Sequence, residues 1–172
     1  MSTGAEGPPT GGTSRSRGTD TADRLAITEL LYRYAELVDA GDFDGVGRLL
    51  GRATFAGTRS SEVSGAAAIA ALFAKTTRRF PDFGTPRTRH LVLNPVVELT
   101  AERTATARST FCVVQATDTV SLQPIVVGRY FDSFSCDPTD PAGWYFTERR
   151  VDVEMVGDVS AHLMFDPRDF DR

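Results

Sequence analysis

The second half of the chain limits its possible folds most strongly, because from residue 88 onward it consists almost entirely of segments with β-strand character. Four such segments are predicted, at residues 88–99, 103–116, 123–136 and 143–156. Alternation is clear in the second segment, where one face would carry Ala105, Ala107, Ser109, Phe111 and Val113. A long antiparallel meander is therefore predicted.

The last of these segments changes its apolar side part-way along. Trp144 and Phe146 are apolar at even positions, whereas the apolar residues further on stand at odd positions, namely Val151, Val153 and Met155. A β-bulge or sharp bend near residues 147–149 would produce this change, and strongly curved sheets need such a feature. The sheet is therefore predicted to be curved.

A long amphipathic helix is predicted ahead of the strands, at residues 21–40, with Thr21 as its N-cap and Gly41 at its end. Its apolar face follows helical spacing through Ile27, Leu30, Leu31, Tyr34, Leu37 and Val38. Asp39 falls on the edge of this face, where a carboxylate is costly unless it finds a partner. It also meets the unfavourable negative end of the helix dipole.

Two further helices are predicted, at residues 42–50 with Asp42 as cap and at residues 65–79 with Ser64 as cap. A short strand is expected between them at residues 53–57. Helices followed by a meander indicate an α+β fold with helices on one face of the sheet. A curved antiparallel or mixed sheet closed in this way forms a cone, or α+β barrel, around a pocket.

Composition places one domain and a tail in the 172 residues. Residues 1–19 are dominated by Gly, Ser, Thr and Pro and are expected to be disordered. A domain is predicted at residues 20–156, and residues 157–172 form an extension that could cover the pocket. The formal charge of −4 argues against a nucleic-acid partner.

No secretory signal or transmembrane segment is expected, so the chain is predicted to be cytoplasmic. Two cysteines do not make a disulfide framework. In a hairpin centred near Asp118, Cys112 would face residues 124–128 and not Cys136, so both are predicted to be reduced thiols. Two histidines are too few for a typical transition-metal site, so neither a metal nor a cofactor is expected.

The chemistry that the sequence favours rests on His90 and Asp39. A lone histidine in a strand is more often structural than catalytic, but the unexplained carboxylate at Asp39 changes that balance. An aspartate that accepts the Nδ1 proton of a histidine leaves Nε2 free to remove a proton from a substrate. A His–Asp pair in an apolar pocket is therefore a candidate for elimination or isomerisation beside a carbonyl.

Three other polar residues are weaker candidates. Tyr34 lies on the apolar face of the first helix and could reach the pocket with its hydroxyl, or could simply be a core aromatic residue. Arg129 could hold a substrate oxygen, although an ion pair with Asp132 or Glu148 is the simpler interpretation. His162, close to the C-terminus, is expected to be solvated.

Four stretches of the chain resemble SnoaL-like domains of the nuclear-transport-factor-2-like superfamily, in the branch that includes scytalone dehydratase. They are residues 34–44 (YAELVDAGDFD), 87–91 (RTRHL), 128–132 (GRYFD) and 143–150 (GWYFTERR). The resemblance implies a cone-shaped, cystatin-like α+β fold with a deep pocket and a homo-oligomer formed through the outer sheet face. It also implies that Asp39 orients His90, as the residues themselves indicate.

The superfamily includes dehydratases, ketosteroid isomerases, polyketide cyclases and epoxide hydrolases, mostly without cofactors, and some members that only bind ligands. The expected function is thus a lyase or isomerase of secondary metabolism acting on a mostly apolar cyclic carbonyl or hydroxyl compound. A non-catalytic binding or accessory protein and an epoxide hydrolase or cyclase are the alternatives. The second histidine of the dehydratase is missing, since Val114 and Gln115 stand in its region, and this makes scytalone itself an unsuitable substrate.

Overall fold

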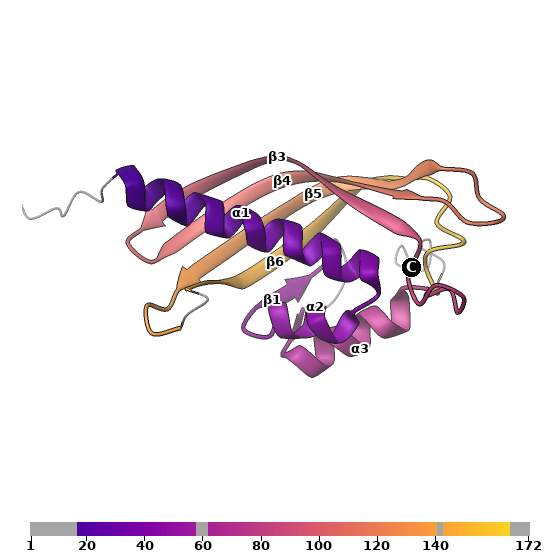
Figure 1. Cartoon of the computed structure of the whole chain (residues 1–172), viewed down its shortest axis with the longest axis horizontal. Coiled ribbons are helices and arrows are strands. Elements are labelled where there is room, and N and C mark those ends of the chain that lie inside the picture. Colours follow the sequence, from indigo (N-terminus) through magenta and orange to yellow (C-terminus); the bar gives the residue numbers. More distant parts are fainter. Residues whose placement is uncertain (1–16, 58–61, 141–142, 166–172) are drawn as a thin grey trace, which may run out of the picture.

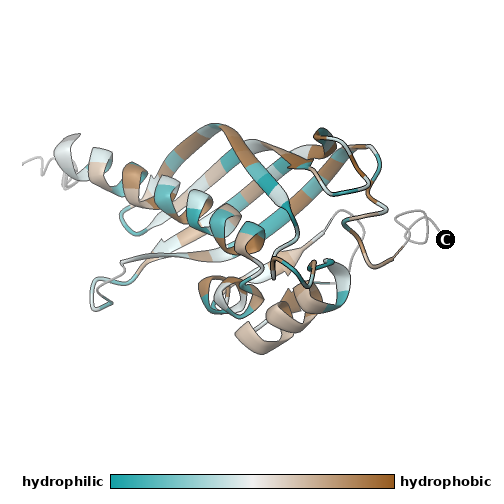
Figure 2. Cartoon of the chain, turned by 45° about the vertical axis from the view of Figure 1, so that its right-hand side comes forward, coloured by the Kyte–Doolittle hydropathy of each residue, from teal (hydrophilic) through white to brown (hydrophobic). Residues whose placement is uncertain are grey.

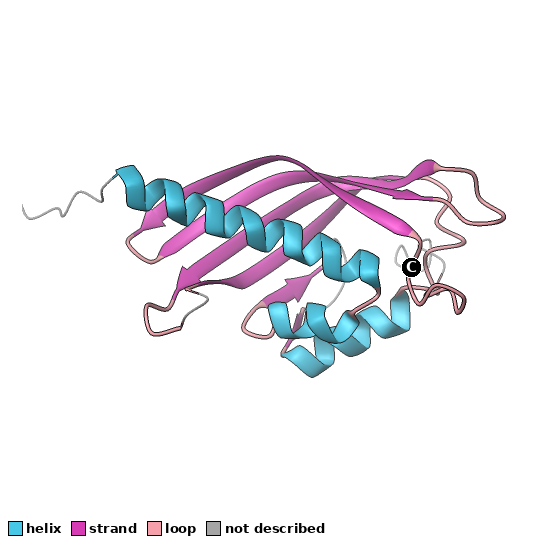
Figure 3. Ribbon diagram, viewed as in Figure 1, coloured by secondary structure: helices cyan, strands magenta, loops and turns pink. Residues whose placement is uncertain are grey.

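The computed structural model describes residues 17–57, 62–140 and 143–165, which form three helices and a curved sheet of six strands (Figures 1 and 3). The α+β class predicted from the sequence is confirmed. The helices are α1 (Arg17–Ala40), α2 (Phe43–Leu49) and α3 (Ala66–Thr76). The strands are β1 (Thr54–Ala56), β2 (Val63–Ser64), β3 (Thr88–Ala101), β4 (Thr104–Gln115), β5 (Gln123–Cys136) and β6 (Trp144–Val156).

The sheet has the strand order β2-β1-β6-β5-β4-β3. Strands β3 to β6 form the predicted antiparallel meander, and the observed bounds differ from the predicted ones by no more than two residues. Cys112 pairs with Val127, within the range predicted for it. The short strand β1 joins the edge of β6 in the parallel direction, so the sheet is mixed.

A β-bulge in β6 produces the predicted change of side, which holds as far as Val153, whereas a second register shift places Met155 on the opposite face. Ser133 pairs with Glu148, but the next residue of β5, Phe134, pairs with Phe146, so Thr147 is the extra residue. Because of it, Phe146 and Arg149 both face the interior, although one number is even and the other odd. The sheet bends here, and Arg149 becomes a buried residue.

Helix α1 crosses the concave face of the sheet, while α2 and α3 pack together at one end beside β1 (Figure 1). Apolar and polar residues alternate along the strands, so one side of each strand can face α1 (Figure 2). The interior is rich in aromatic side chains, including Tyr34, Phe73, Tyr130, Phe134 and Phe146. None of the helices in the described ranges is long and apolar enough to cross a membrane.

Two helix starts differ from those predicted. Helix α1 begins at Arg17, so Thr21 is inside the helix and residues 17–19 are not part of a disordered tail; residues 1–16 lie outside the described residues. Gly65, not Ser64, is the N-cap of α3. Ser64 is instead in β2, where its hydroxyl lies 3.2 Å from that of Thr54. Asp42 caps α2 as predicted, accepting a hydrogen bond from the Gly45 amide.

Candidate active site

Asp39 and His90 are in direct contact inside the molecule. Asp39 lies in the last turn of α1, and His90 is the third residue of β3, the strand on which α1 packs. Nδ1 of His90 is 2.6 Å from Oδ1 of Asp39. The helix-edge position of Asp39 thus corresponds to a buried carboxylate with a partner, as its sequence context indicated.

Three donors fix the Asp39 carboxylate. The backbone amide of His90 donates to Oδ2 at 2.8 Å, and the Thr88 hydroxyl donates to Oδ1 at the same distance. Burial by itself would raise the pKa of Asp39, but the hydrogen bonds and charge of His90 and the Thr88 hydroxyl lower it below its ordinary value. Asp39 is therefore a carboxylate at neutral pH.

An ionised Asp39 determines which ring nitrogen of His90 carries the proton. A carboxylate can only accept, so Nδ1 of His90 donates to it, and the neutral imidazole keeps its lone pair on Nε2. The side chains of both residues are almost fully buried, 8% exposed for His90 and 10% for Asp39. The pair is thus arranged to place a base at Nε2 and to stabilise the imidazolium that proton uptake would form.

A buried ion pair, which the sequence did not reveal, lies on β5 and β6. Nε and Nη2 of Arg149 donate to the two oxygens of Asp132 at 2.8 and 2.9 Å, and both side chains are completely buried. Burial opposes the charge of Arg149, but the Asp132 carboxylate outweighs it and raises the pKa of the guanidinium above its ordinary value. The third nitrogen, Nη1, has no hydrogen-bond partner among the described residues.

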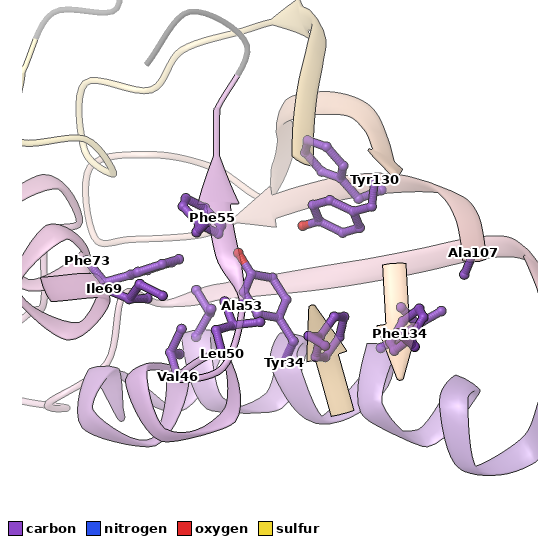
Figure 4. Close-up of a cluster of buried hydrophobic side chains, with 14 of the residues drawn as sticks. Tyr34, Val46, Leu50, Ala53, Phe55, Ile69, Phe73, Ala107, Tyr130 and Phe134 are labelled. Carbon is purple, nitrogen blue, oxygen red and sulfur yellow. The ribbon is translucent and has the colours of Figure 1, made fainter. Parts of the chain in front are cut away.

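Two tyrosines surround this guanidinium. The carbon atom Cζ of Arg149 lies 4.0 Å from the ring centre of Tyr34 and 4.2 Å from that of Tyr130, which are cation–π distances. The two rings meet edge to face at 5.8 Å and belong to the buried cluster that also holds Phe55 and Phe73 (Figure 4). Burial raises the pKa of Tyr34 to about 12, so its hydroxyl remains a donor. Tyr34 therefore lies in the interior near Asp39 and Arg149.

The prediction that Arg129 contacts the substrate is wrong, because the side chain of Arg129 does not lie in the interior. Arg129 is on the outer face of β5, where its side chain is 52% exposed and pairs with Glu154 of β6. Its position differs by one residue from the inward-facing Tyr130, so it points away from His90 and Asp39. The partners predicted for it, Asp132 and Glu148, are also incorrect, because Asp132 lies on the inner face of β5, where it binds Arg149, and Glu148 lies opposite Ser133.

The C-terminal segment, residues 157–165, packs beside the dyad, and His162 is buried rather than solvated. The Arg78 amide donates to the carbonyl of His162 at 2.8 Å, and the Met164 amide donates to the carbonyl of Thr76 at 2.9 Å. Burial, followed by the charge of His90, lowers the pKa of His162 to about 4. Within the described ranges no group of three or more His, Cys, Asp or Glu side chains could hold a metal ion.

A family model described as "SnoaL-like domain" matches residues 19–150. The chain belongs to this family. Among curated proteins, none matches it significantly.

Solved structures share the fold. A nuclear-transport-factor-2-like protein with a cystatin-like fold from Novosphingobium aromaticivorans is 26% identical, with a TM-score of 0.64 over 84% of this chain and 90% of that one. A candidate scytalone dehydratase from the same organism is 18% identical, with a TM-score of 0.65 over 83% and 91%. ActVI-ORFA from Streptomyces coelicolor is 13% identical, with a TM-score of 0.62 over 77% and 98%.

Proposed function

We propose that the chain is a cofactor-independent lyase or isomerase, of the dehydratase or cyclase type, that acts on a mostly apolar cyclic carbonyl or hydroxyl compound. The observation that carries the proposal is the buried pair of Asp39 and His90, in which both carboxylate oxygens are held and Nδ1 is fixed. Membership of the SnoaL-like family supports it, as do fold relatives that include a candidate scytalone dehydratase.

In this mechanism Nε2 of His90 removes the proton on the carbon next to a substrate carbonyl. The electron pair moves onto the carbonyl oxygen, and Asp39 stabilises the imidazolium that forms. In a dehydration the imidazolium then gives its proton to a hydroxyl on the neighbouring carbon, and the carbon–oxygen bond breaks. Water and a carbon–carbon double bond are the products, and His90 returns to its neutral form.

The oxygen that gains charge in this reaction needs a donor. Tyr34 supplies a protonated hydroxyl, and Arg149 supplies a positive charge with a free nitrogen, Nη1. Donors held in a buried site stabilise such charge more than they would in water. Arg149 thus takes the role that the sequence assigned to Arg129, and the aromatic surroundings favour a substrate that is mostly apolar.

The test is elimination from a β-hydroxytetralone, whose dehydration gives a naphthol that absorbs strongly. We expect His90→Ala to lose about 10²-fold or more in rate and Asp39→Asn to lose at least as much, with folding intact. Arg129→Ala is the matched control, because its side chain lies outside the interior, and it should retain the wild-type rate. In D2O the wild type should also exchange the proton next to the carbonyl, and His90→Ala should not.

Two outcomes would contradict the proposed lyase or isomerase activity and indicate a different function. A wild-type protein that binds such compounds but returns them unchanged and without deuterium would be a binding protein, the second candidate function. This candidate is favoured by the missing second histidine of the dehydratase, in whose region Val114 and Gln115 stand; Gln115 donates to two backbone carbonyls. Incorporation of oxygen from labelled water into an epoxide probe would instead indicate hydrolysis.

A further inference from the structure

A buried glutamine connects the C-terminal segment to the dyad. Nε2 of Gln115 donates to the carbonyl of Pro86 at 3.0 Å and to that of Ala161 at 3.3 Å. Gln115 also pairs across the sheet with Thr88, whose hydroxyl holds Asp39. Since Ala161 directly precedes His162, these contacts place the second histidine of the chain beside the dyad.

The same two side chains leave polar atoms without partners. Oε1 of Gln115 and Nδ1 of His162 are buried and form no hydrogen bond with the described residues. The amide of Gln115 cannot be reversed without loss, because both neighbouring groups are carbonyls that only accept. An unpaired buried polar atom costs about 1–3 kcal/mol, so a ligand group that pairs with both atoms would offset that cost.

We propose that Gln115 and His162 form a subsite that binds a hydroxyl group of the ligand. The hydroxyl donates to Oε1 of Gln115 and accepts from Nδ1 of His162, so both unpaired atoms gain a partner. A carbonyl or an ether oxygen fits less well, because neither can donate to Oε1. The inference rests on the proposed function in one respect, since it assigns this subsite to the hydroxyl end of the same substrate.

The charge state of His162 suits this role. Burial is the main cause that keeps His162 neutral near pH 7, so it can donate a hydrogen bond without adding a second positive charge when the imidazolium of His90 forms. The groups that act on it are His90 and Asp39, with opposite effects. The backbone bonds to Arg78 and Thr76 hold the segment in place independently of the imidazole.

The test is calorimetric binding of naphthol and of methoxynaphthalene, its methyl ether, to the full chain at neutral pH. The wild type should bind naphthol about tenfold more tightly than the ether. His162→Leu and Gln115→Met should each remove most of this preference while leaving the affinity for the ether unchanged. His162→Asn should retain much of it, because the asparagine amide occupies the position of Nδ1.

Val159→Ala is the matched control, since it disturbs the packing of the same segment at a buried apolar residue without removing a polar atom. Thermal unfolding of every variant checks that it is folded. Equal affinity of the wild type for naphthol and the ether, failure to bind either one, or an equal loss of preference in Val159→Ala would overturn the proposal. A preference for naphthol in a protein without elimination activity would support the subsite and refute the catalytic assignment, so the two failures are distinguishable.

Discussion

At the scale of single residues, burial changes the pKa of polar groups and thereby makes stability depend on pH. His162 is the clearest case. Its pKa is about 4 in the folded chain, against 6.5 for an ordinary histidine, so the unfolded chain binds more protons between these two values. Unfolding free energy therefore falls as pH falls through this window. The full effect is about 3 kcal/mol.

We expect the wild type to lose more unfolding free energy than His162→Asn between about pH 6.5 and pH 4. Urea unfolding at a series of pH values measures the difference, and all other titrating groups are common to the two proteins. Parallel pH profiles for the two proteins would show that His162 is accessible and titrates normally. Above pH 7 the profiles should run parallel, because His162 is neutral in both the folded and the unfolded chain.

The two arginine pairs of β5 and β6 should differ sharply in their contribution to stability. Asp132→Asn leaves the buried guanidinium of Arg149 without its counter-charge and should cost about 3–5 kcal/mol. Arg129→Ala breaks an exposed pair and should cost less than about 1 kcal/mol. Replacing both Asp132 and Arg149 by apolar residues should cost less unfolding free energy than Asp132→Asn alone. Equal losses in the double variant and in Asp132→Asn would contradict this account.

The residues that sequence analysis located are those whose local context is unusual. Asp39 could be recognised from the sequence as a candidate site residue, because a carboxylate at the edge of an apolar helix face has no local explanation. Arg149 could not be recognised, because the direction of its side chain depends on the exact position of the bulge at Thr147, which turns Arg149 to the inner face. The approximate position of the bulge was predictable, but an error of one residue in that position reverses the face to which Arg149 points.

At the scale of elements, the end of α1 fixes the position of Asp39. Gly41 follows the helix with a φ of +71°, and a Cβ atom there would lie 2.6 Å from the carbonyl oxygen of Gly84. A side chain at this position therefore meets both an unfavourable backbone conformation and a fixed backbone atom. The close approach holds the last turn of α1 against the loop that leads into β3.

Gly41→Ala should lower the unfolding free energy by more than the roughly 1–2 kcal/mol that a left-handed backbone conformation alone costs a residue with a Cβ atom. Gly143→Ala is the matched control, since Gly143 has a φ of +67° and open space around a Cβ atom. Urea unfolding gives both values, and elimination activity should fall only in Gly41→Ala, because only that change displaces Asp39. Equal effects of the two changes would show that the contact with Gly84 is unimportant.

Elements were predictable where their pattern is local and long. The four long strands follow from alternation, and Asp42 identifies the start of α2. The parallel pairing of β1 with β6 joins only three residues on each strand, too few to leave a pattern. The docking of residues 157–165 depends on backbone hydrogen bonds to the end of α3, which no side-chain pattern specifies. For that reason the sequence alone predicts a solvated His162, whereas the structure buries it.

At the scale of the whole molecule, the outer face of the sheet carries an apolar row that spans four strands. Cross-strand pairing aligns its members, which are Leu91, Cys112, Val127 and Met155. Leu91 is 43% exposed and Met155 is 58% exposed. A second copy of the chain is the occupant that the family resemblance implies, and burying such a row supplies a driving force for association.

We predict that the chain is a homo-oligomer and that Met155→Asp weakens the assembly, because a carboxylate is costly to bury in an apolar contact. Light scattering over a range of protein concentrations measures the mass of both proteins. Leu25→Asp is the matched control, since Leu25 is 59% exposed but lies on α1, away from the outer sheet face. It should leave the mass unchanged. A monomeric wild type, or equal dissociation by Met155→Asp and Leu25→Asp, would refute an interface on the sheet. If the prediction holds, the assembly uses the outer face of the sheet and leaves the interior face of the same strands for the ligand.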